Sequence, residues 1–189
     1  MDNLQQQLFE GSRVRLSAID LEKDPDVESK WTHDPDYLRA LSPETVRPLA
    51  PFAVKKRYES IEKEMKEKRN SFYFTIRLKE DDRLIGFTRI EWIEWNNGAG
   101  RLTLGVGSPE DRGKGYGSES LHMILRYAFA ELNLFRLGTL AIPTYNTGAI
   151  RFLERAGFVE EVRRREWVNR DGKRWDAVYL SLLRDEWKR

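Results

Sequence analysis

Three glycines at alternate positions, Gly113, Gly115 and Gly117, dominate the stretch of residues 111–118. Glycine has no Cβ to hold a ligand away from the backbone, and it readily adopts the positive φ angles of an anion-binding turn. An amphipathic helical pattern follows, so the free N–H groups and positive dipole end of a helix would face the glycines. We therefore predict that residues 111–118 bind a pyrophosphate group.

Two familiar phosphate motifs do not match this stretch. The dinucleotide-binding fingerprint requires G-x-G-x-x-G, whereas the glycines here alternate as far as Gly117. A P-loop requires Ser or Thr after its lysine, whereas Gly115 follows Lys114. Because glycines also mark ordinary surface turns, the prediction depends on the elements around the stretch.

Hydrophobic periodicity predicts a mixed α/β fold around the glycines. The expected strands are 14–19, 72–78, 84–95, 101–106, 137–142, 158–168 and 174–183, and the expected helices lie around 27–31, 54–65, 121–132 and 146–156. The stretch 31–52 holds four of the seven prolines, so we expect it to be irregular, with one helical turn near 37–41. Antiparallel strands followed by helix, strand, helix and hairpin predict one mixed sheet with helices on both faces.

Composition limits the possible classes of protein. The 189 residues suit a single domain over 1–189, in which 1–11 form a polar N-terminal extension, and 40% hydrophobic residues exclude a wholly disordered chain. There is no cysteine, which excludes disulfides, thiolate metal sites and a cysteine nucleophile and favours a cytoplasmic location. No run approaches the roughly 18 apolar residues of a membrane span, and we expect no metal site.

Charge gives little reason to expect a nucleic-acid partner. The chain has 33 Lys and Arg residues against 31 Asp and Glu residues, a formal charge of +2. A basic cluster surrounds the last predicted hairpin, but acidic residues interrupt it. Its members are Arg163, Arg164, Arg165, Arg170, Lys173 and Arg174, and the interruptions are Glu160, Glu161 and Glu166. We interpret this cluster as a solvated edge or a homodimer contact rather than a nucleic-acid interface.

The glycine stretch also belongs to a longer pattern. A strand precedes Arg112-x-x-Gly115-x-Gly117, and a helix, another strand, Asn146-x-x-Ala149-Ile150 and finally Ala156-Gly157-Phe158 follow it. This order resembles the GNAT superfamily of acyl-CoA N-acyltransferases, and within it the RimJ/RimL group, which includes polyamine acetyltransferase relatives. The resemblance extends over residues 14–187. It implies the GNAT fold, a largely antiparallel mixed sheet that splays in the middle and has helices on both faces.

The resemblance further implies an acetyl-CoA site and no metal. Backbone amides from Arg112 to Gly117 would receive the pyrophosphate, with the Ser118 hydroxyl at the helix start. The strand 104–106 would hydrogen-bond the pantetheine arm where it splays from 137–142, and Asn146 would touch the cofactor beyond the splay. The implied cofactor-binding residues are Leu104, Gly105, Val106, Arg112, Gly113, Lys114, Gly115, Tyr116, Gly117, Ser118 and Asn146.

Two departures from the family pattern concern proton transfer. Many members carry a leaving-group acid, Tyr, four residues before the glycine of the Gly-Phe pair, where this chain has Leu153. Many also carry a glutamate on the strand before the loop, and residues 101–106 contain none. Glu91 and Glu94, on the neighbouring predicted strand, are the candidate catalytic bases. They would point oppositely in a regular strand, and we favour Glu94, although both also fit surface carboxylates paired with Arg or Lys.

The sequence therefore predicts an acetyl-CoA-dependent N-acetyltransferase. Its acceptor, a primary amine, would attack the thioester directly in a ternary complex, without an acyl-enzyme. A protein N-terminus, a polyamine and a small-molecule amine all fit this chemistry. The alternative, suggested by Leu153 and the absent strand carboxylate, is a non-catalytic acyl-CoA-binding or regulatory protein.

Overall fold

The strands form one mixed sheet. The protein is described here by a computed structural model that covers residues 7–41, 43 and 45–187. Within these residues an eight-stranded sheet has the order β1-β2-β3-β4-β5-β8-β6, and β7 pairs with β8. The strands are β1 (Val14–Ser17), β2 (Phe72–Leu78), β3 (Leu84–Glu94), β4 (Ala99–Val106), β5 (Arg136–Thr139), β6 (Ile142–Pro143), β7 (Val159–Arg170) and β8 (Lys173–Leu183). The pairing of β4 with β5 is parallel and the other pairings are antiparallel, which confirms the predicted sheet type.

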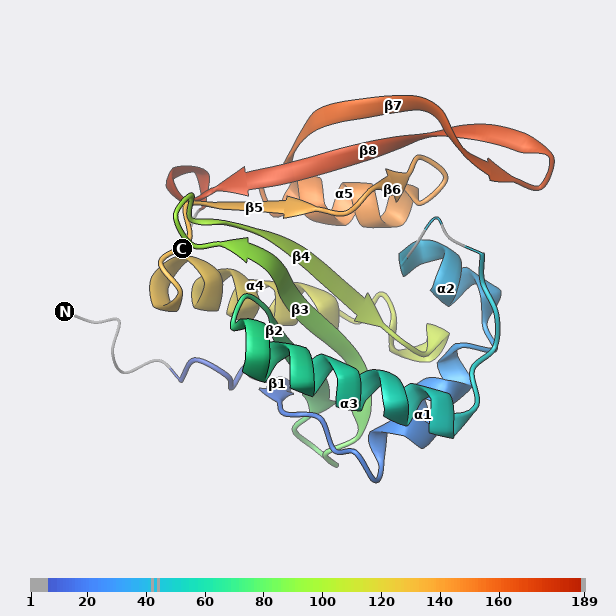
Figure 1. Cartoon of the computed structure of the whole chain (residues 1–189), viewed down its shortest axis with the longest axis vertical. Helices are drawn as coiled ribbons and strands as arrows, with labels where there is room; N and C mark the ends of the chain where they lie inside the picture. The colour runs from blue at the N-terminus through green and yellow to red at the C-terminus, as the bar shows by residue number, and fades with distance from the viewer. Residues whose placement is uncertain (1–6, 42, 44, 188–189) are drawn as a thin grey trace.

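The sheet opens between β4 and β5. Their pairing runs from Ala99 with Arg136 to Leu102 with Thr139 and extends no further within the described residues. In Figure 1 the two strands lie side by side at the left and diverge toward the right, where α2 lies beside the opening. The second half of β4 therefore has no strand neighbour on the β5 side.

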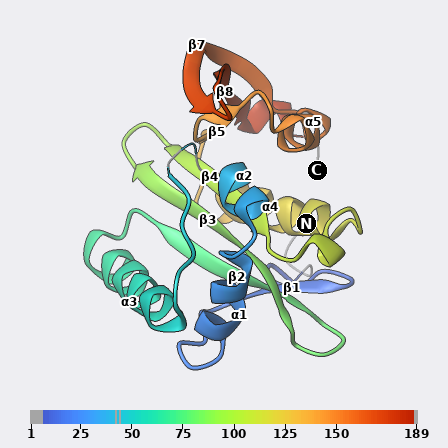
Figure 2. The same ribbon diagram turned by 90° about the vertical axis from the view of Figure 1, so that its right-hand side faces the viewer.

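Helices cover both faces of the sheet (Figure 2). On one face lie α1 (Asp24–Trp31), α2 (Pro35–Leu41) and α3 (Pro51–Lys68), and on the other lie α4 (Tyr116–Arg126), its π-helical continuation Tyr127–Glu131 and α5 (Thr147–Arg155). α3 begins at a proline, a residue that costs nothing at a helix start because the first N–H groups have no helical partner. None of the described helices has both the length and the apolar character needed to cross a bilayer.

Two hydrophobic clusters stabilise the two sides. The larger packs α4, α5 and the sheet through residues such as Ile124, Leu137 and Leu180, which have no measurable exposure. The smaller is largely aromatic and holds α1, α2 and α3 against β2 and β3. Its buried members are Trp31, Tyr37, Val54, Tyr58, Tyr73, Leu84 and Phe87.

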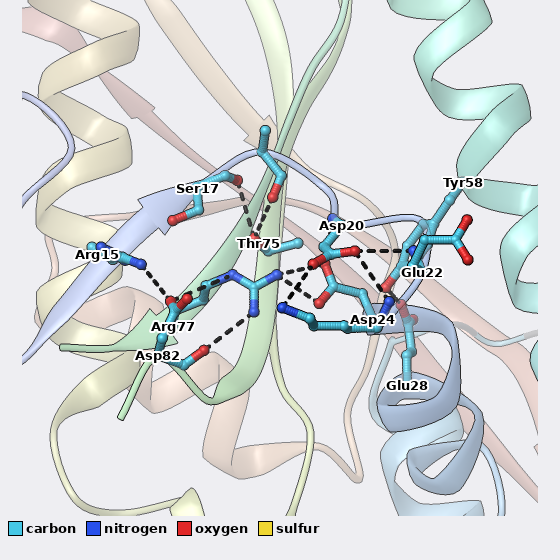
Figure 3. Close-up of polar contacts among 12 residues, drawn as sticks. Arg15, Ser17, Asp20, Glu22, Asp24, Glu28, Tyr58, Thr75, Arg77 and Asp82 are labelled. Atoms are coloured by element: carbon cyan, nitrogen blue, oxygen red, sulfur yellow. Dashed lines mark hydrogen bonds and ion pairs between the residues drawn. The ribbon is translucent and has the colours of Figure 1, made fainter. Parts of the chain in front are cut away.

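Buried polar contacts also fix the position of α1. Arg77 on β2 reaches Asp24 at the start of α1, and its Nη1 donates to the Asp82 carbonyl at 3.2 Å (Figure 3). One turn further along α1, the Glu28 carboxylate accepts a hydrogen bond from Arg57 at 2.5 Å and another from the Tyr58 hydroxyl. These contacts join α1 to both β2 and α3.

Two predictions of local secondary structure need correction. Part of the stretch expected to be irregular forms the helix α2, whose start is supported by a 2.9 Å hydrogen bond from Asp36 N to Asp34 Oδ1; residues 42 and 44 lie outside the described residues. The predicted strand 137–142 is divided into β5, which ends at Thr139, and β6, which begins at Ile142, and at the break Thr139 Oγ1 accepts a 3.1 Å hydrogen bond from Leu180 N.

The expected N-terminal extension is packed at its C-terminal end. Phe9 O accepts a 2.9 Å hydrogen bond from Leu16 N, and the Phe9 ring lies 5.5 Å from that of Phe74. Residues 1–6, the remainder of the polar stretch, lie outside the described residues.

Candidate functional site

The glycine stretch forms a turn between β4 and α4. A short 3-10 helix, Pro109–Asp111, leads into it, and Gly113 and Gly115 adopt φ angles of 74° and 85°. α4 then begins at Tyr116, with Gly115 as its N-cap. In the described part of the chain, the amides of Gly113, Lys114 and Gly115 donate to no other protein group. Three free amides beside a helix N-terminus form an arrangement that suits an anion.

Two arginines from distant parts of the chain hold this turn. Arg83 donates to both oxygens of the buried Asp111 carboxylate, at 2.7 and 2.9 Å. Arg13 donates to the Lys114 carbonyl at 2.9 Å and lies 5.2 Å from the centre of the Tyr116 ring. Neither arginine was identified from the sequence, because pairs separated by this much chain leave no local pattern.

The Arg112 side chain points back toward β4. Its guanidinium donates to the Val106 carbonyl at 3.2 Å and to the Gly107 carbonyl at 2.5 Å, and it forms an ion pair with Asp34 at 3.1 Å. These bonds fix the end of β4 relative to the turn and to the loop before α2. Any contact of Arg112 with an anion at the turn would therefore use its backbone amide.

The first turn of α4 brings the glycines close to the open edge of β4. A Cβ at Gly117 would lie 3.7 Å from Val106 and 3.8 Å from Leu104, which are ordinary contact distances and place this residue directly beside the strand. Ser118 is exposed one residue later and lines a surface cavity of about 480 Å³ between α4 and α5. Lys114 is also exposed.

The backbone of β4 faces the opening with alternate residues. Gly107 N donates to Ile85 O at 2.8 Å, and Gly105 lies opposite Phe87, so odd-numbered residues of β4 bond to β3. The N–H and C=O groups of Leu104 and Val106 consequently point toward β5, where no strand is paired with them. Val106 O already accepts from Arg112, which leaves both groups of Leu104 and the amide of Val106 for an extended ligand.

A small cavity of about 80 Å³ marks the opening itself. It lies between β4 and the chain that follows β5, with α5 on one side and the end of α2 on the other. Its lining residues are Ala40, Leu41, Leu102, Thr103, Leu104, Thr139, Leu140, Ala141, Ile142, Ala149, Phe152 and Leu153. Leu153 is buried there.

Asn146 and Tyr145 tie α2 to α5 across this opening. Asn146 caps α5, because its Oδ1 accepts from Ala149 N at 3.1 Å, and its Nδ2 donates to Ala40 O at 3.1 Å. The Tyr145 hydroxyl donates to Arg39 O at 3.2 Å. Both polar atoms of the Asn146 side chain are thus engaged within the protein, and any contact with a cofactor would add to these bonds.

A larger cavity of about 810 Å³ lies on the face of the sheet that α1, α2 and α3 cover. Arg89 on β3 and Thr103 on β4 face it from directly opposite positions, and Tyr37 on α2 also lines it. Trp92 lines the cavity where β3 bulges, with a φ of 53° and a break in the register with β4. This cavity and the β4 opening share Leu41, Thr103, Leu140 and Ala141, so the two spaces adjoin.

The two candidate bases lie in different environments. Glu94 is exposed at the end of β3, accepts a 2.8 Å hydrogen bond from Asn97 and does not line the larger cavity. Glu91 is largely buried beside Arg89, with 3.1 Å between Oε1 and Nη2. Burial raises the pKa of Glu91 above its ordinary value, and Arg89 and Arg101 offset this only in part. The bulge at Trp92 removes the strict alternation on which the sequence comparison of these two residues relied.

Comparison with known proteins establishes the family. The model of the acetyltransferase (GNAT) domain matches residues 13–159. The chain belongs to the GNAT acetyltransferase family. It is 26% identical over 175 residues to the uncharacterized N-acetyltransferase p20 of Bacillus licheniformis, covering 93% of this chain and 95% of p20. This GNAT protein is therefore an acyltransferase whose relatives are named N-acetyltransferases.

Solved structures share the GNAT fold. Spermidine N-acetyltransferase from Vibrio cholerae, in complex with CoA and spermine, superposes with a TM-score of 0.77 at 20% identity, covering 93% of this chain and 98% of that one. Ribosomal-protein-S5-alanine acetyltransferase from Vibrio fischeri superposes with a TM-score of 0.76 at 22% identity, covering 96% and 98%. Membership of the GNAT family supports the use of acyl-CoA as the donor and the transfer of the acyl group to an amine. Among the described residues, no three or more His, Asp or Glu side chains gather as a metal site.

Proposed function

We propose that this GNAT protein transfers an acetyl group from acetyl-CoA to a primary amine by direct attack in a ternary complex. The observation that carries the proposal is the unpaired edge of β4 at Leu104 and Val106, immediately before the free amides of Gly113 to Gly115. An amide-rich pantetheine arm can bond to such an edge as an added strand. The pyrophosphate would then lie at the turn and the N-terminus of α4.

This placement brings the thioester next to the larger cavity, because that cavity adjoins the β4 opening at Thr103. The amine nitrogen would attack the carbonyl carbon, a backbone N–H would stabilise the developing oxyanion, and the C–S bond would break to release CoA. The proton that the amine loses passes to a base or to water. No residue of the chain is acylated.

Proton transfer limits the rate in this proposal. An alkylamine with a pKa near 10.4 requires roughly 4.6 kcal/mol to lose its proton at pH 7. We carry Glu91 rather than Glu94 forward as the base. Neither carboxylate lines the larger cavity, but Glu91 lies two residues from Arg89, which does, and burial raises the pKa of Glu91 in the direction that suits a base working near neutral pH. With Leu153 in place of a general acid, the thiolate leaves unaided, which costs on the order of 10² to 10⁴ in rate.

We further propose that residues 1–189 form one domain and that the protein lies within the RimJ/RimL-like group. We also propose that it acts in the cytoplasm and forms a homodimer through a contact at the β7–β8 hairpin. The ribosomal-protein and spermidine acetyltransferases among the fold neighbours support the group assignment. The names of these neighbours give two different acceptors, a ribosomal protein and spermidine, so they do not decide the acceptor class of this chain.

The decisive experiment measures acetyl-CoA binding and release of the CoA thiol with a panel of amines. We expect acetyl-CoA to raise the melting temperature, calorimetry to give binding heat, and at least one amine to release thiol without a burst of acylated protein. An unchanged melting temperature together with no binding heat would refute the proposal. Binding without turnover of any amine would favour the non-catalytic alternative.

A further inference from the structure

The larger cavity is rich in arginine. Arg47, Arg57, Arg89 and Arg101 line it, and Glu28 is the one acidic residue of its lining within the described chain. The cavity is about 810 Å³, a size that suits a small molecule. The proposed acceptor would therefore enter a space with an excess of positive charge.

The acidic groups at and beside this cavity are already paired with other side chains. Glu28 is buried and accepts from Arg57 at 2.5 Å and from Tyr58. Glu91 is not a lining residue, but it forms an ion pair at 3.1 Å with Arg89, which is one. Glu64, the other carboxylate close to Glu91, binds Lys68 at 2.7 Å.

Arg101 remains without an acidic partner within 4 Å among the described residues. It lies directly opposite Glu91 on the neighbouring strand and stacks at 4.1 Å over the Trp92 ring, which holds the guanidinium at the cavity wall. A guanidinium held by an aromatic ring keeps its N–H donors available for a planar anion.

Other polar atoms at the same wall are also unsatisfied. Tyr37 is 2% exposed, lines the cavity, and its hydroxyl has no hydrogen-bond partner in the described structure. Arg89 Nε and Thr103 Oγ1, directly opposite each other on β3 and β4, are likewise buried and unpartnered. Buried polar atoms in folded proteins are almost always hydrogen-bonded, so three such atoms on one cavity, with Glu91 Oε1 beside them, indicate a polar ligand.

We propose that the acceptor is a small amine that also carries a carboxylate or phosphate group, and that Arg89 and Arg101, with Tyr37 and Thr103, bind this anionic group. This inference rests on the proposed function and names its substrate class. The arginines stabilise an anion and at the same time disfavour the charged ammonium form of the amine, which increases the fraction of neutral nucleophile. A polyamine, which carries only positive charge, would be repelled by the same wall.

The experiment compares acceptors that differ only in the anionic group. The pairs are tyrosine with tyramine, histidine with histamine, lysine with cadaverine, and phosphoethanolamine with ethanolamine, and spermidine is added as the cationic reference. Release of CoA thiol from acetyl-CoA gives kcat/KM for each. We expect the anionic member of at least one pair to be preferred by about tenfold or more. The pair that shows the preference distinguishes carboxylate from phosphate.

Variants then connect the preference to the cavity. Arg101→Gln should abolish the preference within that pair, and Arg101→Lys, which keeps the charge, should retain part of it. Arg15→Gln, which removes an arginine on β1 whose partner is Asp82, is the matched control and should leave the preference unchanged. Calorimetry with CoA should give the same affinity for all three variants.

Three outcomes would count against the inference. Preference for the member that lacks the anionic group in every pair, or turnover of spermidine alone, would overturn it while leaving the acetyltransferase function intact. An anionic preference that Arg101→Gln does not change would overturn the assigned binding residues. No thiol release with any amine would overturn the proposed function itself, and the inference with it.

Discussion

Arg77 donates two hydrogen bonds to the carboxylate of Asp24, at 2.6 and 2.8 Å, and both side chains are buried. The pair joins β2 to the first residue of α1. Because Glu28 follows one turn later on the same helix, this contact also sets the position of one wall of the arginine-rich cavity.

Breaking this pair should destabilise the protein strongly. Arg77→Gln leaves a buried carboxylate without its cation, a change that typically costs about 3 to 5 kcal/mol of unfolding free energy. Arg15→Gln is the control, because its ion pair with Asp82 is partly exposed, 38% on the arginine side and 58% on the aspartate side, and should contribute less than about 1 kcal/mol. Urea denaturation of both variants measures the difference. Equal losses in the two would show that the Asp24 contact has no special role.

Gly113 and Gly172 allow a matched test of the anion-binding turn. Their φ angles are 74° and 72°, and a Cβ at either position would meet nothing within 4 Å. Alanine at each should therefore cost the same backbone strain, about 1 to 2 kcal/mol. Only Gly113→Ala should also weaken acetyl-CoA binding, because it adds a methyl group and strain where the phosphates approach the backbone.

Calorimetric titration with acetyl-CoA provides the measurement for this pair. Valine at Gly115 or Gly117 should remove binding altogether, since a branched side chain would fill the space beside the turn and the β4 edge. Equal acetyl-CoA affinity in Gly113→Ala and Gly172→Ala would mean that the phosphates bind elsewhere.

The pH dependence of kcat/KM tests Glu91. Burial raises the pKa of this carboxyl above its ordinary value, so its proton-accepting form is lost earlier as pH falls. If Glu91 is the base, activity should decline on the acid side with a midpoint above pH 4.5, the ordinary value, and Glu91→Gln should lose both most of the rate and this limb of the profile. Glu94→Gln serves as the control. A profile that keeps its acid limb in Glu91→Gln would leave water as the proton acceptor.

Local sequence patterns predicted the structural elements of the candidate site that lie in one stretch, namely the strand, the glycine turn and the helix after it. The alternate glycines determine the turn, and the alternation of β4 determines which backbone groups face the opening. Arg83 and Arg13, which hold that turn, could not be predicted, because each meets its partner only through the fold. The arginine-rich wall of the larger cavity could not be predicted for the same reason, because Arg89, Arg101 and Tyr37 come from three separate elements.

The prediction that Glu91 and Glu94 point oppositely assumed a regular strand, and β3 is not regular there. The bulge at Trp92 inserts an extra residue opposite Gly100, and no turn residue marks it in the sequence. The length of α2 was underestimated, because the proline content of 31–52 predicts irregular structure. Asp34 followed by Pro35 is nevertheless an ordinary helix start.

The two hydrophobic clusters have a consequence for how this protein can change over time. The proposed donor half of the site, formed by β4, the glycine turn and α4, packs against the larger cluster, whereas Tyr37 and the helices around the proposed acceptor cavity pack in the smaller aromatic one. Substitutions that reshape the wall of the larger cavity therefore change the packing of the smaller cluster and leave the packing of the larger one unaltered. Acceptor preference can diverge between related chains while the machinery for the acyl donor stays the same.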